Sequence, residues 1–132
     1  MSESAMEASG AATGGVKMLL RCEGFALFLA ACGFYDIWGG PWWLFVVFFL
    51  APDLSFLAYL IGAKEGAIVY NAVHTTIAPI VLAGIGSALS MPFALSIAII
   101  WLAHIGLDRA LGYGLKYQAG FGFTHLGRIG RS

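Results

Sequence analysis

Four long apolar stretches constrain this chain more than any other feature of its sequence. A bilayer core is crossed by about 20 apolar residues in a helix, and a helix satisfies its own backbone hydrogen bonds in hydrocarbon. With 60% hydrophobic and 11% charged residues and a mean hydropathy of +0.85, the composition lies well outside that of soluble domains. We therefore predict an all-α protein, a four-transmembrane-helix bundle whose spans run from about Met18 to Trp38, Trp42 to Ile61, Ala67 to Leu89 and Phe93 to Tyr113.

The remaining sequence leaves two tails and short connections. Residues 1–16 are small, polar and slightly acidic and lack the basic region of a signal peptide, so they are expected to form a disordered tail. Residues 17–115 are expected to form the four-span membrane domain, which leaves no room for a separate soluble domain. Residues 116–132 are rich in glycine, aromatic and basic residues. This tail is expected to lie along the membrane surface without regular helix, because glycine disfavours helices.

Lysine and arginine are distributed on one side of the predicted topology. They occur in the N-terminal flank, the second connection and the C-terminal end, whereas the first and third connections contain neither. Because cytoplasmic flanks are enriched in these residues, both termini are predicted to be cytoplasmic, in a multi-pass protein of the bacterial inner membrane. The net charge of zero argues against a nucleic-acid partner, which needs a basic surface to neutralise phosphates.

Each apolar stretch carries at least one ionisable residue. Such a group costs about 2.5–3.5 kcal/mol at the centre of a membrane helix, so it marks a functional site by default. Counting along each helix from its cytoplasmic end places three of these residues at a common depth of about 12–14 Å. The five residues are Glu23, Asp53, His74, His104 and Asp108, of which Asp53, His74 and His104 share the deeper level.

Helical spacing places further polar residues on the same helix faces, in a second layer one turn closer to the cytoplasm. Asn71 precedes His74 by three residues, and His104 precedes Asp108 by four, so each pair shares a helix face. Two histidines and a carboxylate form the minimal set for a catalytic zinc or a non-haem iron, and Pro52 breaks the second helix beside Asp53. We predict a divalent metal, zinc or iron, held by Asp53, His74 and His104, with Asp108, Asn71 and Tyr70 as catalytic groups and Arg109 and Lys116 at an anionic headgroup.

Structural roles compete with these functional ones. An intramembrane histidine can serve only as a hydrogen-bonding strut between helices, an interaction that contributes about 0.6–2 kcal/mol. Asp108 can pair with a cation near the helix end or orient His104, and Arg109 can extend to the membrane surface. Glu23 is expected to be an interfacial residue paired with a nearby cation, and Asp36 to lie just outside the membrane.

Three motifs carry a family resemblance. They are HIGLDRALGYGLKY at His104–Tyr117, PDLSFLAYLIG at Pro52–Gly62 and YNAVH at Tyr70–His74. In combination they resemble a family of small bacterial four-helix integral membrane proteins, a domain of unknown function, over roughly residues 17–127. The resemblance implies four membrane spans and no established activity. It also places Asp53, His74, His104 and Asp108 within the family's motifs.

Three functions from different classes fit the sequence. The first is a metal-dependent enzyme that activates water and acts on a lipid-like substrate entering from the cytoplasmic leaflet. The second is a small proton- or ion-coupled transporter, which at this length needs a homo-oligomer to enclose a path. The third is an accessory subunit of a larger membrane complex, which would pack against an aromatic face that comprises Trp42, Trp43, Phe45, Phe48 and Phe49.

Overall fold

The computed structural model describes residues 14–113, 123–124 and 127–128. The predicted disorder of residues 1–13 and the predicted role of Lys116 lie outside these residues. Two short strands in the C-terminal tail, β1 (Phe123–Thr124) and β2 (Gly127–Arg128), pair antiparallel. The helical elements are α2 (Gly14–Trp38), α3 (Trp42–Phe48), the 3-10 helix η1 (Ala51–Leu60), α4 (Ala63–His74), α5 (Ile77–Ala88) and α6 (Pro92–Ala110).

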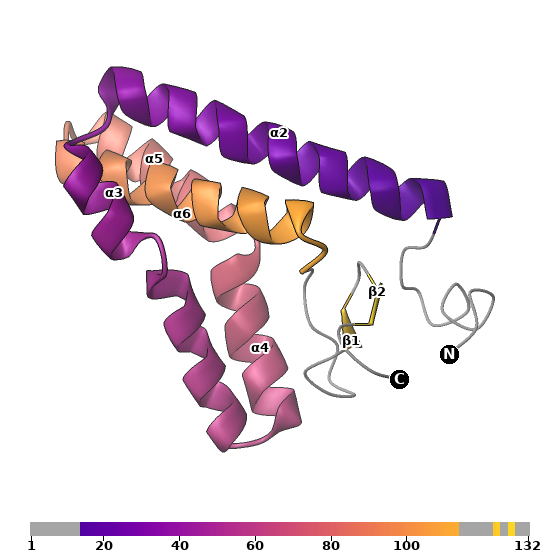
Figure 1. The fold of residues 1–132 in the computed structure, drawn as a ribbon. Coiled ribbons are helices and arrows are strands. Elements are labelled where there is room, and N and C mark those ends of the chain that lie inside the picture. The colour runs from indigo at the N-terminus through magenta and orange to yellow at the C-terminus, as the bar shows by residue number, and fades with distance from the viewer. Residues whose placement is uncertain (1–13, 114–122, 125–126, 129–132) are drawn as a thin grey trace.

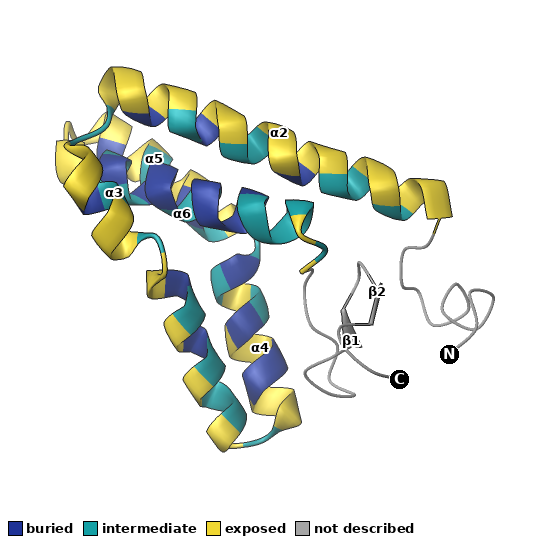
Figure 2. Ribbon diagram, viewed as in Figure 1, coloured by how far each residue is buried: buried dark blue, intermediate teal, exposed yellow. Residues whose placement is uncertain are grey.

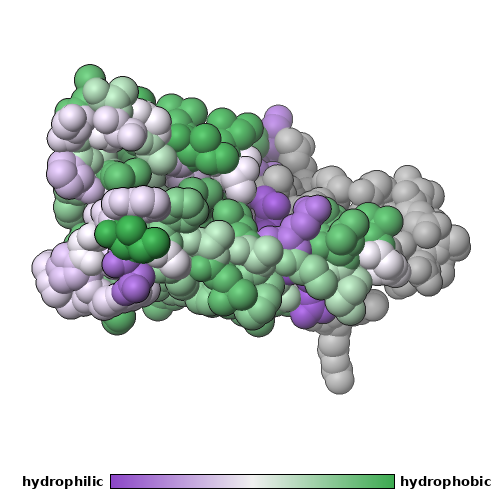
Figure 3. All heavy atoms as spheres, turned by 90° about the horizontal axis from the view of Figure 1, so that it is seen from above, coloured by the Kyte–Doolittle hydropathy of each residue, from purple (hydrophilic) through white to green (hydrophobic). Residues whose placement is uncertain are grey.

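Together these helices form four segments that are long and apolar enough to cross a membrane. The segments are Gly14–Trp38, Trp42–Leu60, Ala63–Ala88 and Pro92–Ala110, which confirms the predicted number and order. The first begins four residues earlier than expected. Seen from above the view of Figure 1, the described surface is mostly hydrophobic, with hydrophilic residues gathered in a few places (Figure 3). These properties indicate a multi-pass membrane protein.

Proline residues divide two of the four segments. A proline ring clashes with the carbonyl group four residues earlier in a continuous helix. The residue four before Pro52 is Phe48, where α3 ends, and η1 then starts at Ala51. The residue four before Pro79 is Thr75, which is extended (φ −79°, ψ 150°) between α4 and α5. The second and third segments are therefore each broken near their middle, and the break at Thr75 was not expected from the sequence.

The breaks give the fold an angled shape that differs from a simple bundle. α6 packs against α2 on one side and α5 on the other. The hairpin formed by η1 and α4, which pack against each other, leaves this layer at a steep angle (Figure 1). α6 is the most deeply buried helix, and the outer faces of the other helices are exposed (Figure 2). The exposed faces are apolar, as lipid contact requires.

Two glycines allow α2 and α6 to approach closely. A Cβ atom added at Gly106 would lie 2.6 Å from the backbone nitrogen of Phe28 and 2.7 Å from the carbonyl oxygen of Gly24. Small residues at such crossings let helix backbones pack closely in membranes. Near this crossing, Arg21 Nε of α2 donates to the Ala110 carbonyl oxygen at 2.9 Å, which satisfies a backbone acceptor at the end of α6.

Substitution of Gly106 by alanine is expected to weaken this crossing. The new methyl group meets backbone atoms that no rotamer change can move, so we expect a loss of about 1–3 kcal/mol in unfolding free energy. Unfolding of the detergent-solubilised protein in a denaturing detergent measures this loss. Gly33→Ala is the matched control, because a Cβ there meets nothing within 4 Å. Equal stabilities of the two variants would contradict the close crossing.

Candidate metal centre

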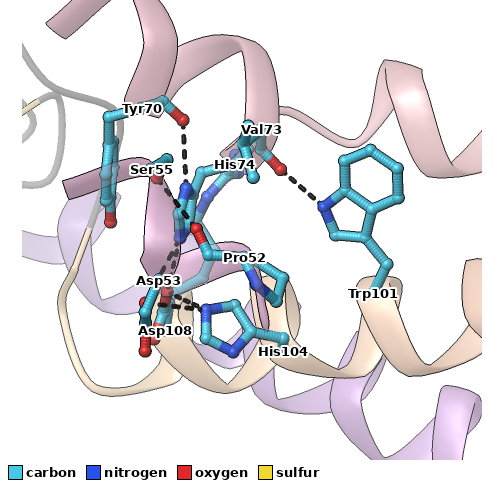
Figure 4. Close-up of polar contacts among 10 residues, drawn as sticks. Pro52, Asp53, Ser55, Tyr70, Val73, His74, Trp101, His104 and Asp108 are labelled. Carbon is cyan, nitrogen blue, oxygen red and sulfur yellow. Dashed lines mark hydrogen bonds and ion pairs between the residues drawn. The ribbon is translucent and has the colours of Figure 1, made fainter. Parts of the chain in front are cut away.

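The helix breaks and α6 bring four ionisable residues together. Asp53 follows Pro52 in the first turn of η1. His74 is the last residue of α4, immediately before the extended Thr75. His104 and Asp108 occupy successive turns of α6. The cluster therefore joins the angled hairpin to the layer formed by α2, α5 and α6 (Figure 4).

The side chains meet at short distances. His104 Nε2 lies 3.1 Å from Asp53 Oδ1 and 3.1 Å from Asp108 Oδ2. His74 Nε2 lies 3.6 Å and 3.4 Å from the same two oxygen atoms. One ligand atom from each of the four residues lies within 4.8 Å of every other. The convergence of Asp53, His74 and His104 was predicted, whereas Asp108 was expected one turn away and instead joins the same cluster.

The orientation of His74 is set by its own helix. Its Nδ1 lies 3.0 Å from the Tyr70 carbonyl oxygen. A carbonyl oxygen only accepts hydrogen bonds, so Nδ1 carries the hydrogen, and Nε2 of the neutral ring presents its lone pair to the cluster. The Tyr70 ring stacks on the imidazole with centroids 3.8 Å apart. Metal-binding histidines typically have such a partner on the second nitrogen.

The donor atoms fit a metal ion. Nε2 of His74 and Nε2 of His104 are both buried, and both face the same two carboxylate oxygens. Bonds of about 2.0–2.1 Å to a tetrahedral ion place neighbouring ligand atoms about 3.3–3.4 Å apart, and the nitrogen–oxygen distances of 3.1–3.6 Å span this value. Two imidazoles and two carboxylates suit zinc and iron.

The cluster is enclosed on its histidine side and accessible on its carboxylate side. The imidazoles of His74 and His104 are 4% and 3% exposed, whereas the Asp53 and Asp108 side chains are 36% and 19% exposed. Phe49 packs edge-on against His104 with centroids 5.3 Å apart. A small molecule can therefore approach the carboxylates while the histidines stay protected from competing donors.

Two α6 side chains satisfy the carbonyl groups that the break after α4 leaves free. Trp101 Nε1 donates to the Val73 carbonyl oxygen at 2.6 Å, and Arg109 Nη2 donates to the His74 carbonyl oxygen at 3.3 Å. The last carbonyls of a helix have no partner within it, and a cation is favourable there. Sequence reasoning did not single out Trp101. Its position one turn before His104 was the only available signal.

Removing the indole donor of Trp101 is expected to weaken the contact between α6 and the end of α4. Trp101→Phe keeps an aromatic ring but leaves the Val73 carbonyl oxygen without its donor, so we expect a loss of about 0.6–2 kcal/mol in unfolding free energy. Trp43→Phe is the control, because Trp43 is exposed on α3. Denaturing-detergent titration compares the two variants. A larger loss for Trp43→Phe than for Trp101→Phe would refute this assignment.

Other predicted residues lie around or away from the cluster. Asn71 is partly buried one turn before His74, and its carbonyl oxygen accepts from the Thr75 backbone. Glu23 is exposed on α2 and is not part of the cluster. Asp36 is exposed and accepts a hydrogen bond of 3.4 Å from Trp42 Nε1.

The predicted aromatic face is divided between the interior and the surface. Phe45 and Phe49 stack on each other, and Phe45 also contacts the buried Tyr35. Trp42, Trp43 and Phe48 are exposed. A partner protein would therefore meet only the outer part of this face.

Comparison with known proteins gives a family without an activity. Residues 17–129 match the family model DUF4260, a domain of unknown function. The match covers most of the chain, so the chain belongs to this family, and the resemblance of its three motifs to an uncharacterised family is confirmed. No curated protein and no solved structure matches the chain.

Proposed function

We propose that this DUF4260 protein is a membrane-embedded, metal-dependent hydrolase of a lipid-like substrate. The observation that carries the proposal is the meeting of Asp53, His74, His104 and Asp108 at metal-ligand distances within an apolar helical protein. The open carboxylate side of the cluster supplies a route for a substrate. A structural strut would need only one hydrogen bond per histidine, and it would not need four convergent donor atoms.

In this proposal Asp53, His74 and His104 hold a zinc or iron ion. When bound, such an ion acts as a Lewis acid and makes water nucleophilic at neutral pH. Asp108 accepts a proton from the attacking water as the ester or phosphoester bond is cleaved, and the leaving oxygen takes up a proton. Tyr70 and Asn71 help to hold His74 in position. Arg109, together with Lys116, attracts an anionic headgroup.

Variants of the proposed metal ligand Asp53 and of the proposed general base Asp108 test this assignment, because they should differ in metal binding. Protein reconstituted with zinc or iron in vesicles of phosphatidylethanolamine and phosphatidylglycerol is expected to release lipid fragments detected by mass spectrometry. Asp108→Asn is expected to retain the metal and lose the release by about 100-fold or more, as the removal of a general base does. Asp53→Asn is expected to lose both. Release that continues in metal-free protein would contradict the proposal.

Transport is a second candidate, and the helix breaks favour it. Broken helices at polar membrane sites recur in transporters, and both breaks here adjoin the cluster. A proton or ion flux in vesicles that Asp53→Asn abolishes, without any lipid cleavage by the wild-type protein, would replace the hydrolase by a carrier.

We also propose that both chain ends face the cytoplasm of a bacterial inner membrane, with the cluster in the cytoplasmic half. Lys64 lies exposed at the start of α4, and Ser90 lies exposed between α5 and α6. With Cys22 and Cys32 replaced by serine, Lys64→Cys is expected to react with a membrane-impermeant thiol reagent from the cytoplasmic side only, and Ser90→Cys from the opposite side only. Labelling of both from one side would contradict this topology.

A further inference from the structure

An apolar cavity of about 240 Å³ adjoins the cluster. It lies where α3 meets η1 and where both face the end of α4 and the middle of α6. Its walls include Pro52, Val73, Ile97, Ile100 and Trp101. The indole N–H of Trp101 already donates a hydrogen bond to the Val73 carbonyl oxygen, so this side chain presents no free polar group to the cavity.

The cavity adjoins the cluster through residues that are neighbours along the chain. Pro52 and Val73 line the cavity, and the next residue after each, Asp53 and His74, belongs to the cluster. On α6, Trp101 lines the cavity one turn before His104. A molecule with an apolar chain in the cavity would thus place the polar end of that chain at the carboxylates. The helix breaks create both parts at once.

We propose that this cavity binds one acyl chain of a membrane phospholipid and so positions the lipid's polar region at the cluster. The inference rests on the proposed function, because it specifies how that site would hold its substrate. The apolar wall excludes a polar ligand. The volume is below the roughly 300–1,000 Å³ of pockets for drug-sized molecules, so it suits a single flexible chain. The surrounding bilayer supplies such chains, so no partner protein is needed to fill the cavity.

Trp101 lies in the wall and can report occupancy by its fluorescence. With Trp38, Trp42 and Trp43 replaced by phenylalanine, the protein is placed in nanodiscs of dioleoyl phosphatidylglycerol that contain rising fractions of phosphatidylglycerol with brominated chains. Bromine quenches a nearby indole. We expect most of the Trp101 quenching to saturate at a low fraction of brominated lipid, as a single binding site requires. Brominated lipid around the protein should then add a shallow linear increase in quenching.

Filling the cavity with a larger side chain is expected to remove the saturating component of the fluorescence quenching. Ile97→Phe should weaken chain binding at least tenfold, about 1.4 kcal/mol. Ala30→Phe is the matched control, because it adds the same ring in a separate hollow between α2 and α6 and should leave the saturation unchanged. Metal content of each variant shows whether the cluster is intact. If Ile97→Phe loses the metal, Ala51→Leu fills the same cavity from η1 and takes its place.

The outcomes separate the two proposals. Purely linear quenching in the wild-type background, or equal loss in the two phenylalanine variants, would overturn the acyl-chain site whatever the metal content. Saturating quenching that Ile97→Phe abolishes, in a protein that binds no metal, would support the acyl-chain site and contradict the hydrolase.

Discussion

Replacing His104 with alanine is expected to abolish metal binding by the purified protein. His104 Nε2 lies 3.1 Å from each carboxylate, closer than His74 Nε2 does, so its loss removes a proposed ligand and leaves two acidic groups with one imidazole. Residues that only orient a ligand typically contribute 10–100-fold to metal affinity, and a ligand contributes more. We therefore expect zinc or iron affinity to fall by more than about 100-fold in a titration of detergent-solubilised protein.

His74→Ala should give the same result, because its Nε2 faces the same two oxygens. Ser96→Ala is the control on α6. Ser96 is also buried, but its hydroxyl donates to the Pro92 carbonyl oxygen of its own helix two turns from His104. If both histidine variants bound metal as tightly as the Ser96 variant, the cluster would be a set of interhelical contacts and not a metal centre.

Removing the metal is expected to destabilise the protein and to loosen the hairpin of η1 and α4. Two of the three proposed ligands, Asp53 and His74, come from this hairpin, and the third, His104, comes from α6. A bound ion therefore links the two parts of the fold. At a free metal concentration of 100 times Kd, binding adds about 2.7 kcal/mol to the unfolding free energy.

Unfolding with and without a chelator measures this effect, and hydrogen exchange locates it. We expect chelation to speed amide exchange in η1 and α4 more than in α2. The double variant His74→Ala, His104→Ala should show neither change. A wild-type protein whose stability and exchange are unaffected by the chelator would contradict the link.

The spans and the meeting of three polar residues could be predicted from the sequence because both depend on simple counting. Apolar length defines the spans, and the shared depth of Asp53, His74 and His104 follows from residue numbers along each helix. Both breaks follow from the same steric clash, since α3 ends four residues before Pro52 and Thr75, four residues before Pro79, is extended. Only the break at Pro52 was expected, although Pro79 is equally visible in the sequence.

The angle of the hairpin and the contacts of α6 could not be predicted in this way. They depend on packing between helices that are distant in the sequence. Asp108 joins the cluster because the hairpin turns toward α6, which brings His74 within 3.4 Å of it. The donation from Trp101 to Val73 likewise appears only when α4 ends beside α6. Residue types and spacing within one helix contain no information about these approaches.

X-ray absorption spectroscopy of the purified wild-type protein, with one equivalent of zinc, tests the metal centre most directly. We predict a first shell of nitrogen and oxygen ligands at about 2.0–2.1 Å, with the outer-shell scattering of two imidazole rings. Cys22 and Cys32 are free and lie on α2, apart from the cluster. A sulfur shell near 2.3 Å, a spectrum without imidazole scattering, or protein that retains no zinc after gel filtration would contradict the account.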